Sequence, residues 1–379
     1  MAFRRIFGGL GWLFIVVAIL SFFYEWDTSR IYYKKLRAKS AYLYEEINPR
    51  YLEIDPRDYL QDKNVSSIRA ALLSAVMGDR DIEKLWPIDV QNVPDASDFL
   101  ECLQESKYRA STPCHKSRYE KWANLGKIQE LIFETDFDLR TNAILFKPEN
   151  FSGKMVIYHH GYAGTFHETH RHLEKLVAAG YLVLAFNTPL YGDVVRLGDN
   201  AFIPNIYKGT APDDISYPTR FFFEPLFAGL NYVLSKEEIQ QVNMIGLSNG
   251  GWATAVFSAM DPRIENSYPI AGVYPVYLRQ LKESAPAQLK KNMLEAASYM
   301  DMFVLAADRS DRSQLQIFNK YDRCCYNNTR GKLYEDAVQE KLGLIGGGDF
   351  QVLIDTTHPR HKISHWAFDQ VFAHMEARS

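Results

Sequence analysis

The segment Gly246-Leu247-Ser248-Asn249-Gly250, followed directly by Gly251, constrains the fold of this chain more than any other part of it. Residues 242–245 before it are mostly apolar and predict a short strand, and residues 252–260 after it predict a helix. Ser248 then lies at the tightest point of a strand–turn–helix unit, where the flanking glycines remove Cβ atoms that would clash. A serine raised above a sheet edge in this way is built to act as a nucleophile.

Apolar runs and amphipathic runs alternate from residue 127 onward, and each predicts one element. The expected strands are residues 128–135, 137–147, 155–158, 181–186, 242–245, 268–274, 315–318 and 350–354. The expected helices are residues 169–179, 219–234, 252–260 and 363–375. Because strands that alternate with helices imply right-handed crossovers, the sequence predicts an α/β fold with a mostly parallel sheet flanked by helices.

Attack by a serine requires a base that takes the hydroxyl proton, an acid that orients the base, and donors for the oxyanion. Asp322 follows the expected strand 315–318 and is the predicted acid. Asp308 is the alternative, if residues 302–308 form a strand instead.

His361 is the predicted base, because it lies in the loop between the last expected strand and the last expected helix. His358 and His365 lie in the same stretch and are the alternatives. For the oxyanion, the backbone N–H groups of Asn249 and Tyr162 are the predicted donors. Asn249 begins the helix after Ser248, and Tyr162 belongs to the loop after the expected strand 155–158.

Several histidines lie close together and raise the question of a metal site. The only carboxylates close to these histidines in the sequence are Glu168 and Glu174, so we expect no metal site here. We also expect no cofactor. The histidines in question are His159, His160, His167, His170 and His172.

From about Lys127 to its end, the chain resembles the α/β-hydrolase superfamily, in which the order is nucleophile, acid, histidine. The doubled glycine after Ser248 is similar to prolyl-oligopeptidase-like and acetyl-xylan-esterase-like branches. The residues that carry the resemblance are His160-Gly161, Gly246-Leu247-Ser248-Asn249-Gly250, Asp322 and His361. The chain departs from the pattern at the pair Cys324-Cys325 and at Asn249; we expect neither departure to touch the chemistry, but both leave the subfamily open.

The resemblance implies a serine hydrolase that cleaves a carboxylic ester through a Ser-His-Asp triad and an acyl-enzyme. A prolyl-oligopeptidase-like peptidase is one alternative, although no propeller-like repeat precedes the domain. A non-catalytic binding scaffold tethered to a membrane is the other. The long irregular segment 188–218, which contains several aromatic residues, and the insertion 275–301, which reads as helical, are expected to cap a pocket for a small-molecule or carbohydrate ester.

The amino terminus predicts a membrane anchor. Residues 6–24 carry no charge and are long enough to cross a bilayer, and Arg4 and Arg5 precede them. We therefore expect a single-pass membrane protein with a transmembrane anchor over residues 1–26 and a catalytic domain on the extracytoplasmic side. A cleaved signal peptide and a buried helix are the alternatives, and the basic residues after the segment weaken the predicted orientation.

The remaining organisation follows from these assignments. We expect a helical N-terminal segment over residues 27–125 and the catalytic domain over residues 126–379. The net charge of -3 gives no indication of nucleic-acid binding. The four cysteines, Cys102, Cys114, Cys324 and Cys325, could form disulfides in an exported domain or stay free thiols in a reducing compartment, and both possibilities stay open.

Overall fold

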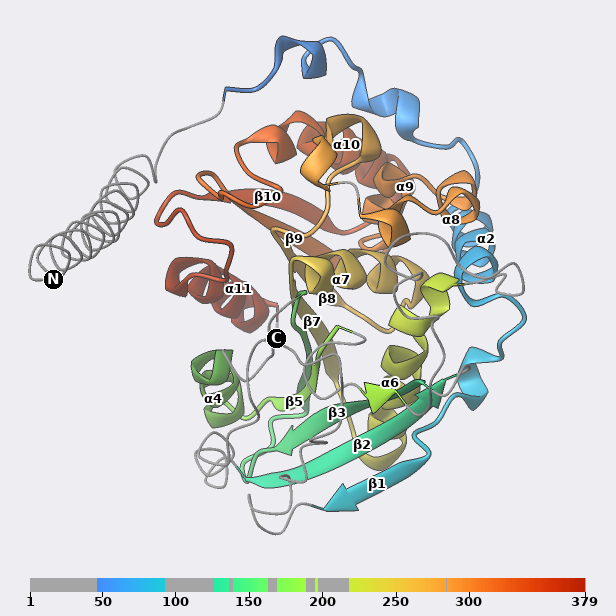
Figure 1. Ribbon diagram of the computed structural model, residues 1–379, viewed down its shortest axis with the longest axis vertical. Coiled ribbons are helices and arrows are strands. Elements are labelled where there is room, and N and C mark those ends of the chain that lie inside the picture. The colour runs from blue at the N-terminus through green and yellow to red at the C-terminus, as the bar shows by residue number, and fades with distance from the viewer. Residues whose placement is uncertain are drawn as a thin grey trace, which may run out of the picture. The chain divides into compact units, whose positions relative to one another are not determined.

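The computed structural model describes residues 46–92, 126–135, 139–162, 169–188, 195–196, 218–283 and 285–378 (Figure 1). The strands are β1 (Asp89–Asn92), β2 (Lys127–Thr135), β3 (Leu139–Lys147), β4 (Lys154–His159), β5 (Leu182–Phe186), β6 (Val195–Arg196), β7 (Gln241–Leu247), β8 (Asn266–Ile270), β9 (Ser313–Asn319) and β10 (Asp349–Asp355). The α-helices are α2 (Val65–Met77), α4 (His170–Ala178), α6 (Glu224–Lys236), α7 (Asn249–Met260), α8 (Lys291–Ala296), α9 (Tyr299–Leu305), α10 (Glu335–Ile345) and α11 (His365–Ala377).

The described strands join one mixed sheet with the order β1-β2-β3-β5-β4-β7-β8-β9-β10, and β6 pairs with β3. Pairing is antiparallel from β1 to β5 and parallel from β5 to β10. The predicted mostly parallel sheet is therefore confirmed. Because parallel strands end at the same edge, the loops after β4, β7, β9 and β10 meet there, and this edge is where such sheets bind ligands.

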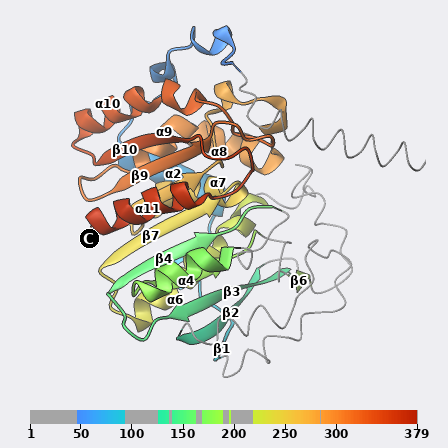
Figure 2. The same cartoon turned by 90° about the vertical axis from the view of Figure 1, so that its left-hand side faces the viewer.

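Two layers of helices cover the sheet, because successive side chains of a strand point to opposite faces. Met155 and Ile157 of β4 pack into the core that α2, α6, α7, α9 and α10 share. Val156 and Tyr158 pack into the core on the other face, with α4 and α11. Figure 2 shows α4 and α11 on the face toward the viewer.

Two of the differences between the structure and the predicted elements have a clear physical reason. The expected strand 268–274 ends at Ile270, because Ala271 takes a positive φ of 45° that breaks the strand. The alternative strand 302–308 is instead the helix α9 and the turn after it. Ser298 and Asp301 form a capping box at the start of α9, which satisfies backbone donors and favours the helix.

The described part of the N-terminal segment packs on the sheet rather than standing apart from it. Ile68, Leu72 and Val76 of α2 are buried in the larger core, and β1 extends the sheet. Residues from Glu46 onward accordingly form one compact unit. The predicted boundaries of the segment 27–125 stay a prediction, since residues 27–45 and 93–125 lie outside the described residues.

The expectation of a single-pass membrane protein is contradicted by the helices that the structure describes. Within the described ranges, none is long and apolar enough to span a bilayer. The longest of these, such as α2 and α11, have 13 residues. A helix of this length extends about 20 Å, short of the roughly 30 Å hydrocarbon core. The predicted anchor over residues 1–26 itself lies outside the described residues.

We predict that Leu72→Ala lowers the free energy of unfolding by about 2–5 kcal/mol, because a fully buried leucine leaves a cavity in the shared core. Urea unfolding followed by circular dichroism and tryptophan fluorescence should still show one transition. Leu52→Ala, at a leucine that is 64% exposed, is the matched control and should change stability by less than about 0.5 kcal/mol. Equal effects of the two substitutions would contradict the packing of α2.

Candidate active site

Ser248 lies in a strained turn between β7 and α7. Its φ of 57° and ψ of -121° are in a region that residues with a side chain rarely adopt. Its N–H donates to the Ile270 carbonyl at 2.9 Å, and its own carbonyl accepts from the Trp252 N–H at 2.9 Å. The strand before and the helix after therefore hold the serine in this conformation.

Glycines make the turn possible because other chain segments approach their Cα atoms closely. A Cβ at Gly246 would lie 2.1 Å from the Gly250 carbonyl oxygen, and one at Gly250 would lie 2.2 Å from the His159 carbonyl oxygen. A Cβ at Gly272, after β8, would lie 2.4 Å from the Ser248 carbonyl oxygen. The turn at residues 246–250, called the elbow below, is thus closely packed within itself, against the end of β4 and against the residues after β8.

The loop after β4 packs directly against the serine. A Cβ at Gly161 would lie 2.7 Å from the Ser248 Cβ and 3.4 Å from its Oγ. This approach brings the backbone next to Gly161, and with it Tyr162, to the serine. Asn249 is the first residue of α7, where backbone N–H groups have no partner within the helix and the helix dipole favours negative charge. Asn249 therefore follows the serine directly in the chain, whereas Tyr162 belongs to the loop after β4, whose Gly161 packs against the serine.

Asp322 and His361 are in contact in the loops after β9 and β10. The distance from Asp322 Oδ2 to His361 Nδ1 is 2.6 Å, and the Asp322 side chain is fully buried. Among the described residues, the opposite ring nitrogen of His361, Nε2, has no hydrogen-bond partner. No hydrogen bond joins it to Ser248 there, and such bonds in free enzymes often form only when substrate is bound.

Further hydrogen bonds fix both loops. The Asn319 side-chain amide, at the end of β9, donates to the carbonyls of Arg360 and Lys362 at 3.2 and 3.1 Å. It thereby holds both neighbours of His361. The Cys324 N–H donates to Asp322 Oδ1 at 2.8 Å, which orients the carboxylate toward the imidazole.

The alternative acid and bases point elsewhere. Asp308 pairs with Arg69 at 2.9 Å and with Arg312 at 2.6 Å. His358 accepts from the Arg360 N–H at 3.0 Å and lies 3.1 Å from Asp355. His365 is the first residue of α11 and lies beside His172, with ring centroids 6.5 Å apart.

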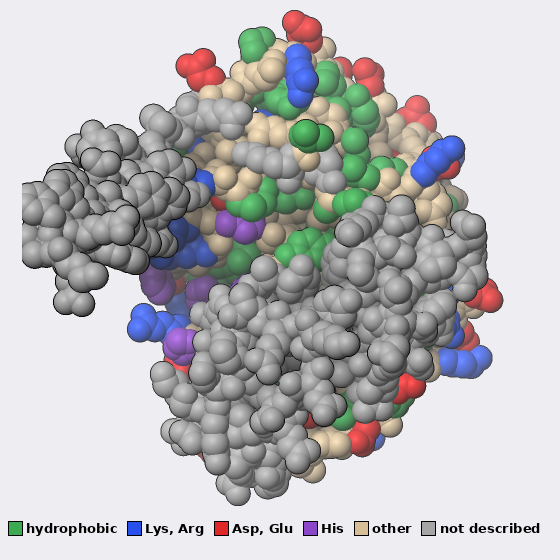
Figure 3. Space-filling view, in the orientation of Figure 1, with side chains coloured by type: hydrophobic (Ala, Val, Ile, Leu, Met, Phe, Trp, Pro, Cys, Tyr) green, Lys and Arg blue, Asp and Glu red, His purple; other side chains and the backbone are tan. Residues whose placement is uncertain are grey.

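The histidine-rich region forms no metal cluster among the described residues; His167 and Glu168 lie outside them. Burial lowers the pKa of His159 and of His172 to about 4, so both are neutral near pH 7. On the face seen in Figure 3, one histidine side chain lies beside hydrophobic side chains, and others lie toward the left edge of the view near lysine or arginine side chains.

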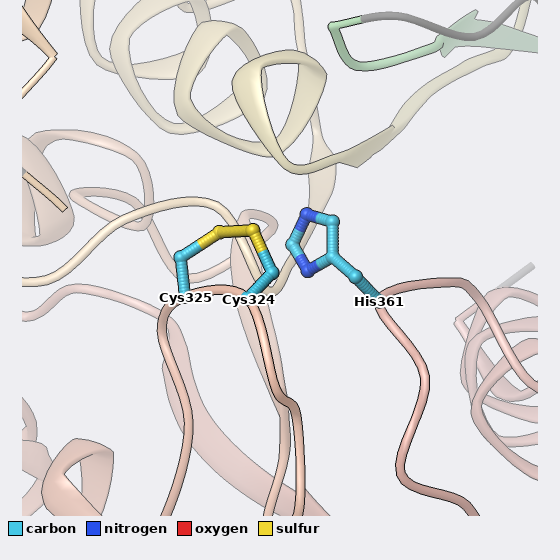
Figure 4. A group of neighbouring side chains, drawn as sticks. All are labelled: Cys324, Cys325 and His361. Atoms are coloured by element: carbon cyan, nitrogen blue, oxygen red, sulfur yellow. A yellow bond between two sulfur atoms is a disulfide. The ribbon is translucent and has the colours of Figure 1, made fainter. Parts of the chain in front are cut away.

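A different trio could hold a metal. One ligand atom each from Cys324, Cys325 and His361 lies within 4.8 Å of the other two, and Figure 4 shows the sulfur pair facing the imidazole. Cys324 and Cys325 are joined by a disulfide here. Cys102 and Cys114 lie outside the described residues.

One of the two expected capping segments can be located. Most of residues 188–218 lies outside the described residues. The segment 275–301 reaches the elbow, because the Gln288 side-chain amide donates to Asn249 Oδ1 at 3.4 Å. Gln288 is held in turn by Arg279 and the Tyr326 hydroxyl, both at 2.8 Å from its Oε1.

Sequence reasoning missed three residues that build this site: Gly272, Asn319 and Cys324. Asn319 follows an expected strand at the carboxyl edge, and that position was the available signal. Gly272 lies inside the expected strand 268–274, and only the observed end of β8 at Ile270 places it after a strand. The expectation that Cys324-Cys325 does not touch the chemistry stays a prediction, although the Cys324 N–H donates a hydrogen bond to Asp322. No sequence pattern predicts that a backbone N–H will donate to a particular carboxylate.

Comparisons with solved structures show which fold this chain has. No protein-family model and no curated protein matches this chain. Acetyl xylan esterase 1 from Thermoanaerobacterium sp. JW/SL YS485 matches with a TM-score of 0.53 and 15% identity, over 85% of this chain and 97% of that one. Acetyl xylan esterase from Paenibacillus sp. R4 matches with 0.55 and 15%, over 85% and 98%. Methylesterase BT1017 matches with 0.52 and 13%, over 85% and 65%. At these identities the likeness concerns the fold alone.

We predict that Asp355, which holds the loop that carries His361, contributes to the free energy of unfolding in a pH-dependent way. Burial alone would raise its pKa, but hydrogen bonds from His358, Ser364 and Thr357 outweigh it and lower the pKa from 3.8 to about 2. The ionised carboxylate is therefore stabilising above about pH 4, and this contribution is lost as the pH falls toward about 2.

Urea unfolding of the wild type and of Asp355→Asn at several pH values measures the effect. The stability gap between them should be largest near neutral pH and should narrow below about pH 4. A gap that does not change with pH would contradict the role given to the carboxylate.

Proposed function

This chain has an α/β-hydrolase fold, and we propose that it is a serine hydrolase that cleaves carboxylic esters through Ser248, His361 and Asp322. The observation that carries the proposal is the 2.6 Å contact between a buried carboxylate and an imidazole at the sheet edge where the elbow serine lies. Among the described residues, the second ring nitrogen of this histidine, His361 Nε2, has no hydrogen-bond partner, which supports its proposed role as the base.

In the proposed mechanism, Ser248 Oγ attacks the ester carbonyl carbon while His361 Nε2 takes the hydroxyl proton. Asp322 holds the imidazole in the required tautomer and stabilises the imidazolium that forms. Collapse of the tetrahedral intermediate breaks the bond to the leaving oxygen, which takes the proton from His361 and departs as an alcohol. Water then attacks the acyl-enzyme by the same route and releases the acid.

The proposed oxyanion hole consists of the Asn249 and Tyr162 N–H groups. Donors aimed at the developing negative charge commonly contribute about 2.7–4 kcal/mol each to the transition state. The close approach of Gly161 to Ser248 supports the Tyr162 donor, and the helix start supports the Asn249 donor.

The substrate class is proposed from the comparisons. Two of the matched structures are acetyl xylan esterases and one is a methylesterase. We therefore propose small-molecule or carbohydrate esters, with acetylated sugars as the first substrates to test. Peptide amides serve as the comparison substrates, because a prolyl-oligopeptidase-like enzyme would cleave them instead.

We predict that Ser248→Ala lowers turnover of an acetyl ester by about 10⁴-fold or more and abolishes labelling by a fluorophosphonate probe. Ser235→Ala removes an exposed hydroxyl at the end of α6 and is the matched control. It should keep both properties. A folded wild type that neither labels nor hydrolyses any ester would overturn the proposal and favour a binding scaffold.

We also predict that Asp322→Asn lowers kcat by about 10⁴-fold, because an amide no longer holds the catalytic tautomer. Asp308→Asn tests the other acid. It should lower stability, since Arg69 and Arg312 lose a charged partner, but should leave the kcat of the folded fraction unchanged. Steady-state kinetics with thermal unfolding on each variant separates the two effects, and the reverse pattern would assign the acid to Asp308.

A further inference from the structure

Two neighbouring cysteines lie beside the proposed catalytic base. Cys324 and Cys325 follow Asp322 in the loop after β9, and His361 comes from the separate loop after β10 (Figure 4). One possible metal-ligand atom from each of the three residues lies within 4.8 Å of the other two. Among the described residues, these three side chains are the group whose spacing could hold a metal ion. The reaction proposed above uses the histidine and leaves both sulfurs without a role.

We propose that Cys324 and Cys325, once their disulfide is reduced, bind a thiophilic divalent metal ion such as Zn²⁺ together with His361, and that bound metal switches off hydrolysis. The inhibitory part rests on the proposed function, whereas the binding part does not. In the disulfide form the sulfurs have no thiolate to offer, so the site is closed to metal.

The donor set suits zinc. Thiolate sulfur and imidazole nitrogen are its preferred ligands, and two thiolates neutralise the charge of the ion. Two sulfurs at about 2.3 Å from a tetrahedral zinc lie about 3.8 Å apart, so the two sulfurs, bonded to each other here, must separate after reduction. The histidine ligand atom already lies within 4.8 Å of both sulfurs. Water completes the fourth position.

The orientation of the His361 ring also suits a metal ligand. His361 Nδ1 faces Asp322 Oδ2 at 2.6 Å, and Nε2 has no hydrogen-bond partner among the described residues. Metal-binding histidines commonly present one ring nitrogen to the metal and the other to a carboxylate. Since Nε2 is also the proposed base, a metal on this atom takes away the lone pair that accepts the serine proton.

The redox step is a two-electron exchange. A dithiol attacks the disulfide through its thiolate, breaks the bond between the two Sγ atoms and is itself oxidised to a disulfide, while both cysteines become thiols. Zinc then displaces the two thiol protons. Cys324 is exposed and Cys325 is 9% exposed, so the attack is expected at the Cys324 sulfur.

The test compares zinc binding to the oxidised and reduced forms of the same full-length chain. A soluble phosphine reduces the disulfide, with water supplying the oxygen of the phosphine oxide, and is removed under argon before Zn²⁺ titration by calorimetry. We expect one additional Zn²⁺ per chain after reduction. Oxidised protein that binds zinc equally well, or reduced protein that gains no zinc, would overturn the proposal.

Variants locate the site. Cys324→Ser with Cys325→Ser should lose the added zinc, and His361→Ala should weaken it by at least about tenfold. The matched control, Cys102→Ser with Cys114→Ser, removes the other two cysteines and should keep the added zinc. If this control loses the zinc while the Cys324/Cys325 variant binds it, the site is elsewhere and the proposal fails.

Activity supplies a separate arm. Zinc should inhibit reduced wild type at least tenfold, a chelator should restore the rate, and the Cys324/Cys325 variant should keep its own zinc-free rate when zinc is added. Inhibition of that variant as strong as that of the wild type would refute the inhibitory role. If no ester is cleaved and Ser248 does not label, the proposed function fails, and the calorimetry still decides the metal site by itself.

Discussion

The left-handed backbone at Ser248 is the constraint on which the rest of the site depends. A residue with a side chain stays at φ 57° only when the structure around it leaves no alternative. Here β8 accepts the serine N–H, and glycines let three neighbouring segments approach to distances that a Cβ would block. The strain is thus held by the core of the sheet, and the hydroxyl is presented by rigid elements rather than by a flexible loop.

The proposed acid and base depend on a second, more local set of contacts. The loops after β9 and β10 lie side by side because these strands pair in parallel, with Asn319 opposite Asp355. From this register, Asn319 reaches across to the carbonyls on either side of His361, and Asp355 binds Ser364 at the start of α11. The imidazole is therefore fixed from both ends of its loop.

Much of this architecture could be predicted from local sequence. The elbow is a contiguous pattern, and most strands appear at their predicted places because short apolar runs between turn residues have few other uses in an α/β fold. Asp322 and His361 were predicted from chain order and loop position. Asn319 and Cys324 could not be predicted, because their partners depend on the register of strands and on backbone atoms, which no residue type encodes. The capping box that makes residues 299–305 a helix was missed because the apolar run alone fits a strand equally well.

The order of the parts along the chain has a consequence for biosynthesis. The elbow and its glycine supports come from β4, β7 and β8, whereas the imidazole hangs between β10 and α11, near the carboxyl end of the sequence. Synthesis therefore completes the elbow segments before the segment with His361, so a partly synthesised chain carries the first without the second. On the proposed mechanism such an intermediate has a serine but no base, so hydrolysis begins only when the last strand has docked.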